Sequence, residues 1–166
     1  SICAFQLAYT LFQPLCGWLI DVIGLKVGFM ICAIIWAIAC IAHAGAGSWL
    51  QLAILRFTMG ASEAAATPAN AKTLGEWFPK SERPVAAGWA GVGFSIGAML
   101  APPIIYFAHG AFGWQGAFMF TGVLALVWVL LWWAFYSNPE KHPNLSKEEL
   151  AYIKQDNEAP AVKLPF

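Results

Sequence analysis

Apolar residues dominate this sequence in long runs, and short polar segments interrupt them. Five runs are long enough to cross a bilayer as helices, which takes about 17–25 residues. The runs are residues 1–20, 28–45, 49–71, 85–107 and 114–136. This pattern predicts an all-α membrane protein with five transmembrane helices, joined by turns at 21–26, 72–84 and 108–113 and by a short segment after Gly45.

The polar tail, residues 137–166, has a different character. Ser146 and Glu149 have the spacing of a capping box, so a short amphipathic helix is expected from Ser146 to about Asp156. The first residues of the chain already have the pattern of a helix interior. We therefore expect the chain to be a fragment of a longer protein.

The composition agrees with a membrane protein. Of the 166 residues, 60% are hydrophobic and only 11% are charged, whereas soluble domains have about 25% charged residues. The net charge of zero gives no electrostatic basis for binding nucleic acid. The 4 cysteines lie in apolar runs without a C-x-x-C pair, so neither a disulfide framework nor a metal site is expected.

Charge placement indicates how the predicted helices are oriented. Every basic residue except Arg56 falls in alternate turns or in the tail, which places them on one side of the membrane. By the positive-inside tendency, that side is the cytoplasm. The acidic residues follow the same division except for Glu63. Arg56 and Glu63 are therefore the only fully charged side chains predicted within the membrane.

These two charged residues are the strongest candidates for function, because a charge near the bilayer centre costs at least about 2.5–3.5 kcal/mol. Arg56 and Glu63 are seven residues apart, so both lie on one helix face about 10 Å apart along the axis, and Asn70 continues that face. We expect each to face a polar cavity. An arginine can hold a carboxylate by two parallel hydrogen bonds, and a glutamate can gain or lose a proton. Such a pair suits a symporter of protons and an organic acid; a purely structural ion pair is the alternative.

A second candidate is the segment from Gly17 to Lys26, which has the pattern G-x-L-x-D-x-x-G-x-K. Gly17 and Gly24 permit a tight turn and close approach of helices. Asp21 lies at a helix end, where it can pair with a cation or with the N-terminus of another helix. We interpret the segment as a gating latch that breaks when the two halves of a transporter rock. A simple polar loop is the alternative.

Weaker candidates for polar contacts lie on other helices. Tyr9 and Gln13 share a face with Gly17 because they recur every four residues. Ser95 is a further polar residue within an apolar run.

Small residues also recur every four positions, at Gly93, Gly97 and Ala101, and they favour close helix packing. A flexible seam beside the cavity is the functional alternative. His43 and His109 fall near the outer ends of two runs, where we expect interfacial positions and not metal ligation.

Several separate motifs resemble the major facilitator superfamily and, within it, the anion:cation symporter family. The D-x-x-G-x-K turn at Asp21 resembles the signature loop between the second and third helices. The R-x-x-x-G-x-x-E segment at Arg56, followed by Pro68, resembles the fourth helix. Residues 76–83 resemble the next cytoplasmic connection, and residues 138–153 resemble the start of the central loop. Within the family, the hexuronate transporter group looks most similar.

The resemblance implies two six-helix halves with alternating access to a central site. This chain would supply part of the N-terminal six-helix bundle, helices two to six, and the missing first helix and C-terminal half would complete the transporter. The resemblance also implies proton coupling by Glu63, anion recognition by Arg56 and a cavity position for Tyr9. Val22 departs from the family pattern because an arginine usually follows the signature aspartate. Gly91 stands where some relatives have a polar residue.

Together these observations predict a proton-coupled symporter for a sugar acid such as glucuronate or galacturonate, without a cofactor, in the bacterial inner membrane. The expected substrate-binding residues are Arg56, Tyr9, Gln13, Asn70 and Ser95, and the expected gating residues are Gly17, Asp21, Gly24 and Lys26. Two alternatives stay open: a transporter of another carboxylate, such as an aromatic acid, and a non-transporting membrane scaffold or sensor with the same fold. An enzyme is not expected, because Glu63 has no His or Cys partner at helical spacing.

Overall fold

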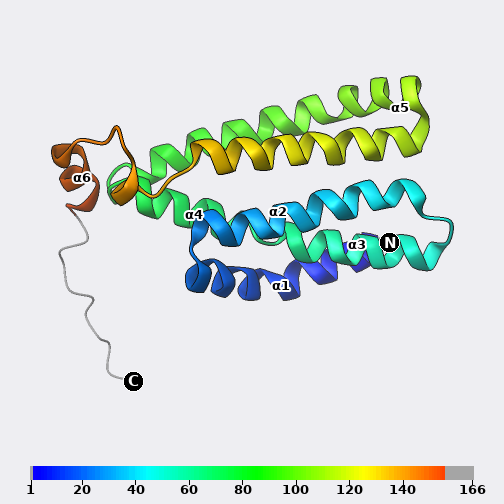
Figure 1. Cartoon of the computed structure of the whole chain (residues 1–166), viewed down its shortest axis with the longest axis horizontal. Coiled ribbons are helices and arrows are strands. Elements are labelled where there is room, and N and C mark those ends of the chain that lie inside the picture. Colours follow the sequence, from blue (N-terminus) through cyan, green and yellow to red (C-terminus); the bar gives the residue numbers. More distant parts are fainter. Residues whose placement is uncertain (1, 156–166) are drawn as a thin grey trace.

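The computed structural model describes residues 2–155, which form helices joined by short turns (Figure 1). The elements are α1 (Ile2–Ile23), α2 (Leu25–Ala42), η1 (His43–Gly45), α3 (Trp49–Glu63), α4 (Ala66–Trp77), α5 (Arg83–Phe135), η2 (Pro139–Lys141) and α6 (Lys147–Lys154). No strand occurs in this part of the chain. Its helical architecture agrees with the expected all-α class.

Three helical segments of the described range are long and apolar enough to span a membrane. They are α1, α2 together with η1, and α5. The helices α3 and α4 are shorter, with 15 and 12 residues. The count of five membrane spans therefore stays a prediction.

The 53-residue helix α5 is a hairpin with two arms that run side by side in opposite directions (Figure 1). Gly113 separates the arms with φ 71° and ψ −177°, a conformation that glycine adopts without steric cost. A turn over residues 108–113 was expected, but the first arm stays helical up to Phe112. The reversal thus depends on a single residue.

The expected third span, residues 49–71, is divided in two. Helix α3 ends at Glu63, and α4 begins at Ala66 and continues to Trp77, through much of the connection expected at 72–84. Pro68 has no amide hydrogen, so it cannot donate to the carbonyl of Ala64 as a continuous helix would require. The interruption lies directly after Glu63 and so places that residue at a helix end.

The turn expected at 21–26 is also shorter than expected. Helix α1 continues to Ile23 and α2 begins at Leu25, so only Gly24 is non-helical, with φ 95°.

Helices α1, α2 and the α3–α4 break share a buried core of small and apolar side chains. Its members are Cys16, Ile20, Leu25, Cys32, Ala64, Ala65 and Ala69. The first arm of α5 contrasts with this core, because every residue from 91 to 107 is exposed. Nothing in the described part of the chain comes within 4 Å of a Cβ placed at Gly93 or Gly97. The small-residue stripe therefore packs against no described residue.

The turn after α1, the α4–α5 connection and α6 gather at one end of the bundle (Figure 1). The α2–α3 connection and the bend between the two arms of α5 lie at the opposite end (Figure 1). The capping box expected at Ser146 is present, and its α6 ends at Lys154; Asp156 lies outside the described residues.

Candidate functional site

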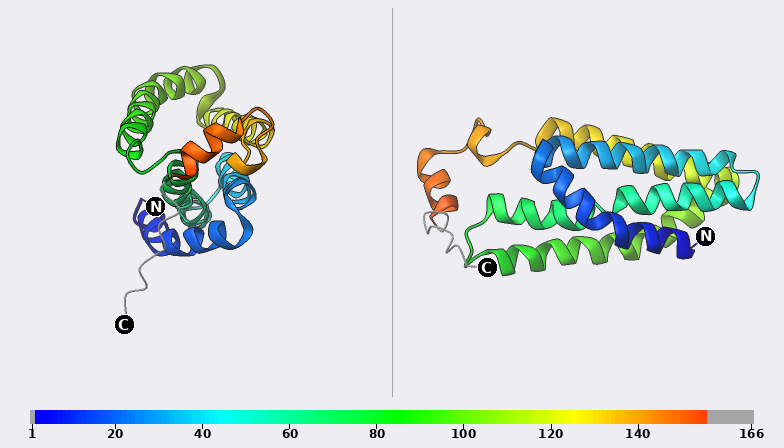
Figure 2. Two further views of the ribbon diagram at one scale, coloured as in Figure 1. Left: turned by 90° about the vertical axis from the view of Figure 1, so that its left-hand side faces the viewer. Right: turned by 90° about the horizontal axis from the view of Figure 1, so that it is seen from below.

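A cavity of about 740 Å³ lies between α2, α4 and both arms of α5. This volume is in the range of small-molecule sites, which are mostly apolar with few polar groups. Its aromatic wall consists of Phe29, Trp36, Phe94, Trp128 and Trp132. The end-on view in Figure 2 shows the first arm of α5 set apart from the α1–α4 helices.

The polar wall of this cavity contains two of the predicted site residues. Glu63, at the end of α3, and Asn70, on α4, both line it. Thr73 lies about one turn beyond Asn70, and Thr121 contributes from the second arm of α5. The seven-residue spacing of Glu63 and Asn70 thus brings both to one cavity despite the break between α3 and α4.

Arg56, the other charged residue of the predicted pair, has a different neighbour. It does not line the cavity, and within the described residues it forms no ion pair with Glu63. Its guanidinium carbon lies 5.9 Å from the ring centroid of Phe118, on the second arm of α5. Arg56 is therefore not in the wall of the cavity that Glu63 lines, and the expectation that it faces a polar cavity stays a prediction.

The other expected binding residues also lie outside the cavity wall. The Tyr9 hydroxyl shares a hydrogen bond of 2.9 Å with the hydroxyl of Thr67 and so connects α1 with α4. Gln13 is half-buried. The Ser95 hydroxyl donates to the carbonyl of Gly91 at 3.0 Å, within its own helix.

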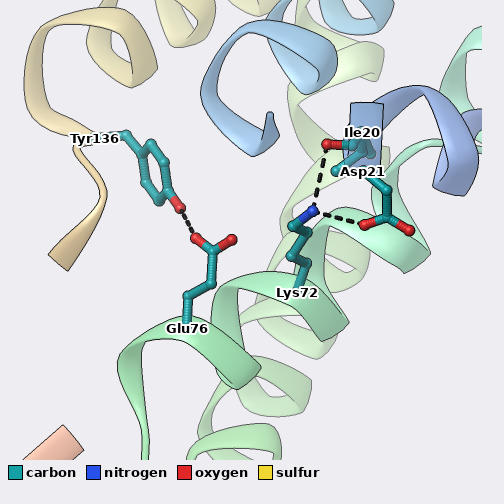
Figure 3. Close-up of polar contacts among 5 residues, drawn as sticks. All are labelled: Ile20, Asp21, Lys72, Glu76 and Tyr136. Atoms are coloured by element: carbon teal, nitrogen blue, oxygen red, sulfur yellow. Dashed lines mark hydrogen bonds and ion pairs between the residues drawn. The ribbon is translucent and has the colours of Figure 1, made fainter. Parts of the chain in front are cut away.

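Figure 3 shows the contacts around the predicted gating segment. The ammonium of Lys72 lies 2.6 Å from Asp21 Oδ1 and also donates to the carbonyl of Ile20 at 3.4 Å. Of the two partners considered for Asp21, a cation or the N-terminus of another helix, the structure has a cation, Lys72 of α4. Gly17 is less crowded than expected, because a Cβ there would lie 3.6 Å from Pro68 Cβ, which is ordinary contact.

The end of α5 is connected to the same region. The indole nitrogen of Trp132 donates to the carbonyl of Lys26 at 3.2 Å, and the hydroxyl of Tyr136 donates to Glu76 Oε2 at 3.1 Å (Figure 3). The Trp132 and Tyr136 rings are stacked with centroids 4.1 Å apart. Lys26 thus takes part through its backbone carbonyl, and α1, α2, α4 and α5 are joined at one end of the bundle.

The His43 side chain is completely buried, at 0% exposure. Its expected position near the membrane interface stays a prediction. Its Nδ1 is 2.7 Å from the carbonyl oxygen of Ala39, and its ring stacks on Phe118 with centroids 5.0 Å apart. His109 is exposed. Across residues 2–155, no group of three or more His, Cys, Asp or Glu residues is placed to hold a metal ion.

Sequence reasoning missed Lys72 as the partner of Asp21, and it missed Thr73, Thr121 and Trp36 in the cavity wall. The only sequence signal for Lys72 was its basic character in a connection that was expected to be cytoplasmic. The threonines and the tryptophan carried no motif.

Comparison with known proteins identifies a matching family and several similar transporters. The sequence model described as Major Facilitator Superfamily matches residues 2–165. A galacturonate transporter of Dickeya chrysanthemi is 48% identical over 158 residues, covering 95% of this chain and 46% of the relative. A hexuronate transporter of Escherichia coli K12 is 45% identical over 158 residues, covering 95% and 37%. A D-galactonate transporter of Escherichia coli O6:H1 is 32% identical over 165 residues, covering 96% and 38%. The chain thus spans less than half the length of these relatives.

Proposed function

The chain belongs to the major facilitator superfamily, and from this membership we propose that it forms part of a proton-coupled symporter for a hexuronate such as galacturonate or glucuronate. Its segments would be helices two to six and the beginning of the central cytoplasmic loop. A first helix and a C-terminal half would complete the transport pathway. Family membership makes the chain part of a transporter and not of an enzyme.

The observation that carries this proposal is the placement of Glu63 and Asn70 in the wall of one cavity. A carboxyl group within a membrane-spanning segment is costly, and such groups are functional by default. Glu63 is half-buried and forms no ion pair with Arg56 in the described part of the chain. We propose that it binds the coupled proton.

The substrate class is supported by the names of the relatives. The two relatives at 48% and 45% identity are named as galacturonate and hexuronate transporters, and the one at 32% as a D-galactonate transporter. All three named substrates carry a carboxylate. We propose that Arg56 binds this group, because its guanidinium has a planar set of donors that matches two carboxylate oxygens. Asn70 would bind sugar hydroxyls, and Tyr9, Gln13 and Ser95 would join the site as the helices rearrange.

The end of the bundle that carries Lys26, Lys72 and Arg83 is proposed to face the cytoplasm of a bacterial cell, with the bilayer around the helices. There, the Asp21–Lys72 pair would act as a latch between α1 and α4, and Gly17, Gly24 and Lys26 would shape the turn that carries Asp21. Alternating access in such transporters is a rocking of helix bundles around a fixed site. Breaking the pair in one state and restoring it in the other would couple the turn to this motion.

Uptake measurements test the proposal directly. The full-length protein is reconstituted into vesicles, and uptake of labelled galacturonate and labelled glucuronate is followed with and without an inward proton gradient. Gradient-dependent, saturable accumulation of either acid supports a proton-coupled hexuronate symporter. If accumulation does not depend on the proton gradient, proton coupling is excluded. If neither acid is taken up, a hexuronate is excluded as the substrate.

The same vesicles are used to test whether the substrate is another carboxylate, such as an aromatic acid. The aromatic wall of the cavity, including Trp36 and Phe94, favours aromatic acids as competitors. A panel of unlabelled aromatic acids is therefore added to the galacturonate assay. If an aromatic acid competes more strongly than unlabelled glucuronate, the proposed substrate becomes an aromatic acid.

A further inference from the structure

The side chains of Arg56, Phe118 and His43 come from different elements and contact one another in a row, which we call the column. The Arg56 guanidinium carbon lies 5.9 Å from the centroid of the Phe118 ring. The His43 ring stacks on the same phenyl ring, with centroids 5.0 Å apart and an interplanar angle of 14°. Phe118 thus connects the cation of α3 with the buried histidine at the end of α2.

His43 itself is held in one orientation. It is completely buried, and Nδ1 is 2.7 Å from the carbonyl oxygen of Ala39, so this nitrogen carries the proton and donates. Its other nitrogen, Nε2, has no hydrogen-bond partner within the described residues. Burying a polar atom without a partner opposes folding, and an aliphatic side chain would avoid that cost. Besides the hydrogen bond to Ala39, the imidazole adds a flat face against Phe118.

The backbone around Phe118 is fixed as well. Its carbonyl oxygen lies 3.6 Å from the thiol sulfur of Cys40 on α2, and its ring meets the edge of Trp114 at a centroid distance of 6.4 Å. At the next turn, a Cβ at Gly122 would lie 3.0 Å from the carbonyl oxygen of Ala37, so α2 and α5 are in close contact here. The phenyl ring is therefore part of a rigid surface.

Arg56 lies against the Phe118 ring without an ion pair or a side-chain hydrogen bond to another described residue. Among residues 2–155 its guanidinium takes part in neither of the ion pairs found there and in no hydrogen bond to another described side chain. A cation–π contact engages the ring face and leaves the N–H donors of the guanidinium available. A long flexible side chain that is already oriented loses less freedom when a ligand binds.

We propose that Phe118 is a positioning residue for Arg56, and that His43 holds Phe118 in place by stacking on it. The inference rests on the proposed role of Arg56 in binding the substrate carboxylate. It adds Phe118 and His43 to the residues that determine substrate affinity, although neither of them lines the cavity or carries a charge. Their contribution is to the affinity for the anion, through the orientation of the guanidinium.

Matched substitutions in the full-length protein separate positioning from plain packing. Phe118→Tyr keeps an aromatic face beneath Arg56, and Phe118→Leu removes it. His43→Phe and His43→Leu both lose the hydrogen bond to Ala39, but only the first keeps a flat ring. Phe120→Leu is the control, since Phe120 is on the same arm and is exposed. Folding of each variant is checked by thermal unfolding, and KM and maximal rate are measured for labelled galacturonate.

We expect Phe118→Leu to raise KM by about 2- to 30-fold, with little change in maximal rate. This fold-change corresponds to the loss of one cation–π contact. His43→Leu should raise KM in the same direction, while Phe118→Tyr, His43→Phe and Phe120→Leu stay near the wild-type KM. If Phe118→Leu lowers only the maximal rate or the folded amount, the column is packing and the inference is overturned. If Arg56→Lys raises KM but Phe118→Leu leaves it unchanged, the inference fails and the proposed function stands. If the wild-type protein takes up no galacturonate, the proposed function itself fails.

Discussion

The ammonium of Lys72 lies 2.6 Å from Asp21 Oδ1 and connects the last turn of α1 with α4 (Figure 3). The Asp21 side chain is 72% exposed and that of Lys72 is 27% exposed. Exposed ion pairs contribute only about 0.2–1 kcal/mol to stability. An interaction that weak can be broken and formed again in the proposed transport cycle, which suits the proposed latch better than a permanent brace.

Charge reversal at this pair should therefore affect transport more than stability. Asp21→Lys and Lys72→Asp each place like charges together, so we expect a several-fold loss of maximal uptake rate and a stability change of no more than about 1 kcal/mol. The double variant restores an opposite-charge pair and should recover a large part of the rate. Initial uptake rates and thermal unfolding midpoints measure the two effects. A double variant as slow as the single ones would exclude a latch formed by this pair.

Glu63→Gln removes the titratable group from the cavity wall while keeping the size of the side chain. We expect proton-driven accumulation of galacturonate to be lost, because no carboxyl group remains to carry the coupled proton. Exchange of external for internal galacturonate should persist in part, since it needs no net proton movement. Glu148→Gln, in the exposed first turn of α6, is the control and should accumulate substrate normally. Uptake by Glu63→Gln that still follows the proton gradient would remove Glu63 from the coupling mechanism.

Arg56→Lys keeps the positive charge but replaces a planar fork of donors with a single ammonium group. We expect KM for galacturonate to rise by about tenfold or more, since hydrogen bonds to charged groups contribute about 1.5–3 kcal/mol each. Concentration series of labelled uptake give KM directly. An unchanged KM would place the substrate carboxylate elsewhere in the protein.

The helical class and part of the candidate site could be predicted from the sequence, because they depend on local spacing. Run length and apolar character are sufficient to predict membrane helices. The seven-residue interval between Glu63 and Asn70 is close to two helical turns, and both residues line one cavity. The capping box at Ser146 involves residues three apart and is present as predicted.

The remaining features depend on which helices pack together, and local patterns carry no such information. Asp21 and Lys72 are 51 residues apart in the sequence, so their pairing follows from the contact of α1 with α4. The contact of Arg56 with Phe118 has the same origin, because Phe118 lies 62 positions further along the chain and reaches Arg56 only where the second arm of α5 approaches α3. A turn over residues 108–113 was predicted, but only Gly113 leaves the helical conformation there.

Close packing of α1 on α3 gives a prediction about stability. A Cβ at Gly60 would overlap the carbonyl group of Phe5, and it would lie 3.1 Å from Phe5 Cα. Gly60→Ala should therefore force the two helices apart and cost about 1–3 kcal/mol, measured as a lower unfolding midpoint in detergent. Gly75→Ala is the matched control, because nothing lies within 4 Å of a Cβ there and alanine favours a helix. Equal midpoints for the two variants would show that α1 and α3 tolerate separation.

The capping box of α6 makes the stability of this helix depend on pH. The backbone N–H of Ser146 donates to Glu149 Oε2 at 2.9 Å, and the N–H of Glu149 donates to Ser146 Oγ at 3.1 Å. These hydrogen bonds favour the carboxylate, first through the backbone and then through the side chain of Ser146, so the pKa of Glu149 lies below its ordinary value of 4.5. A lowered pKa in the folded state means that the stabilisation is fully present above the unfolded value and is lost as the pH falls through the folded value.

Hydrogen exchange of the α6 amides, corrected for the intrinsic pH dependence of exchange, measures this effect in the full-length protein. Protection should be constant from pH 7 down to about pH 5 and should decrease below about pH 4.5, where the unfolded glutamate begins to bind a proton. Glu149→Gln keeps an oxygen that can accept from Ser146 but has no titratable group, so its protection should be weaker at pH 7 and should not decrease in the same way. Glu148→Gln leaves the box intact and should behave as the wild type. A decrease of equal size in Glu149→Gln would mean that another acid, such as Glu140 in its ion pair with Lys154, controls the helix, because only a group that titrates can make the protection depend on pH.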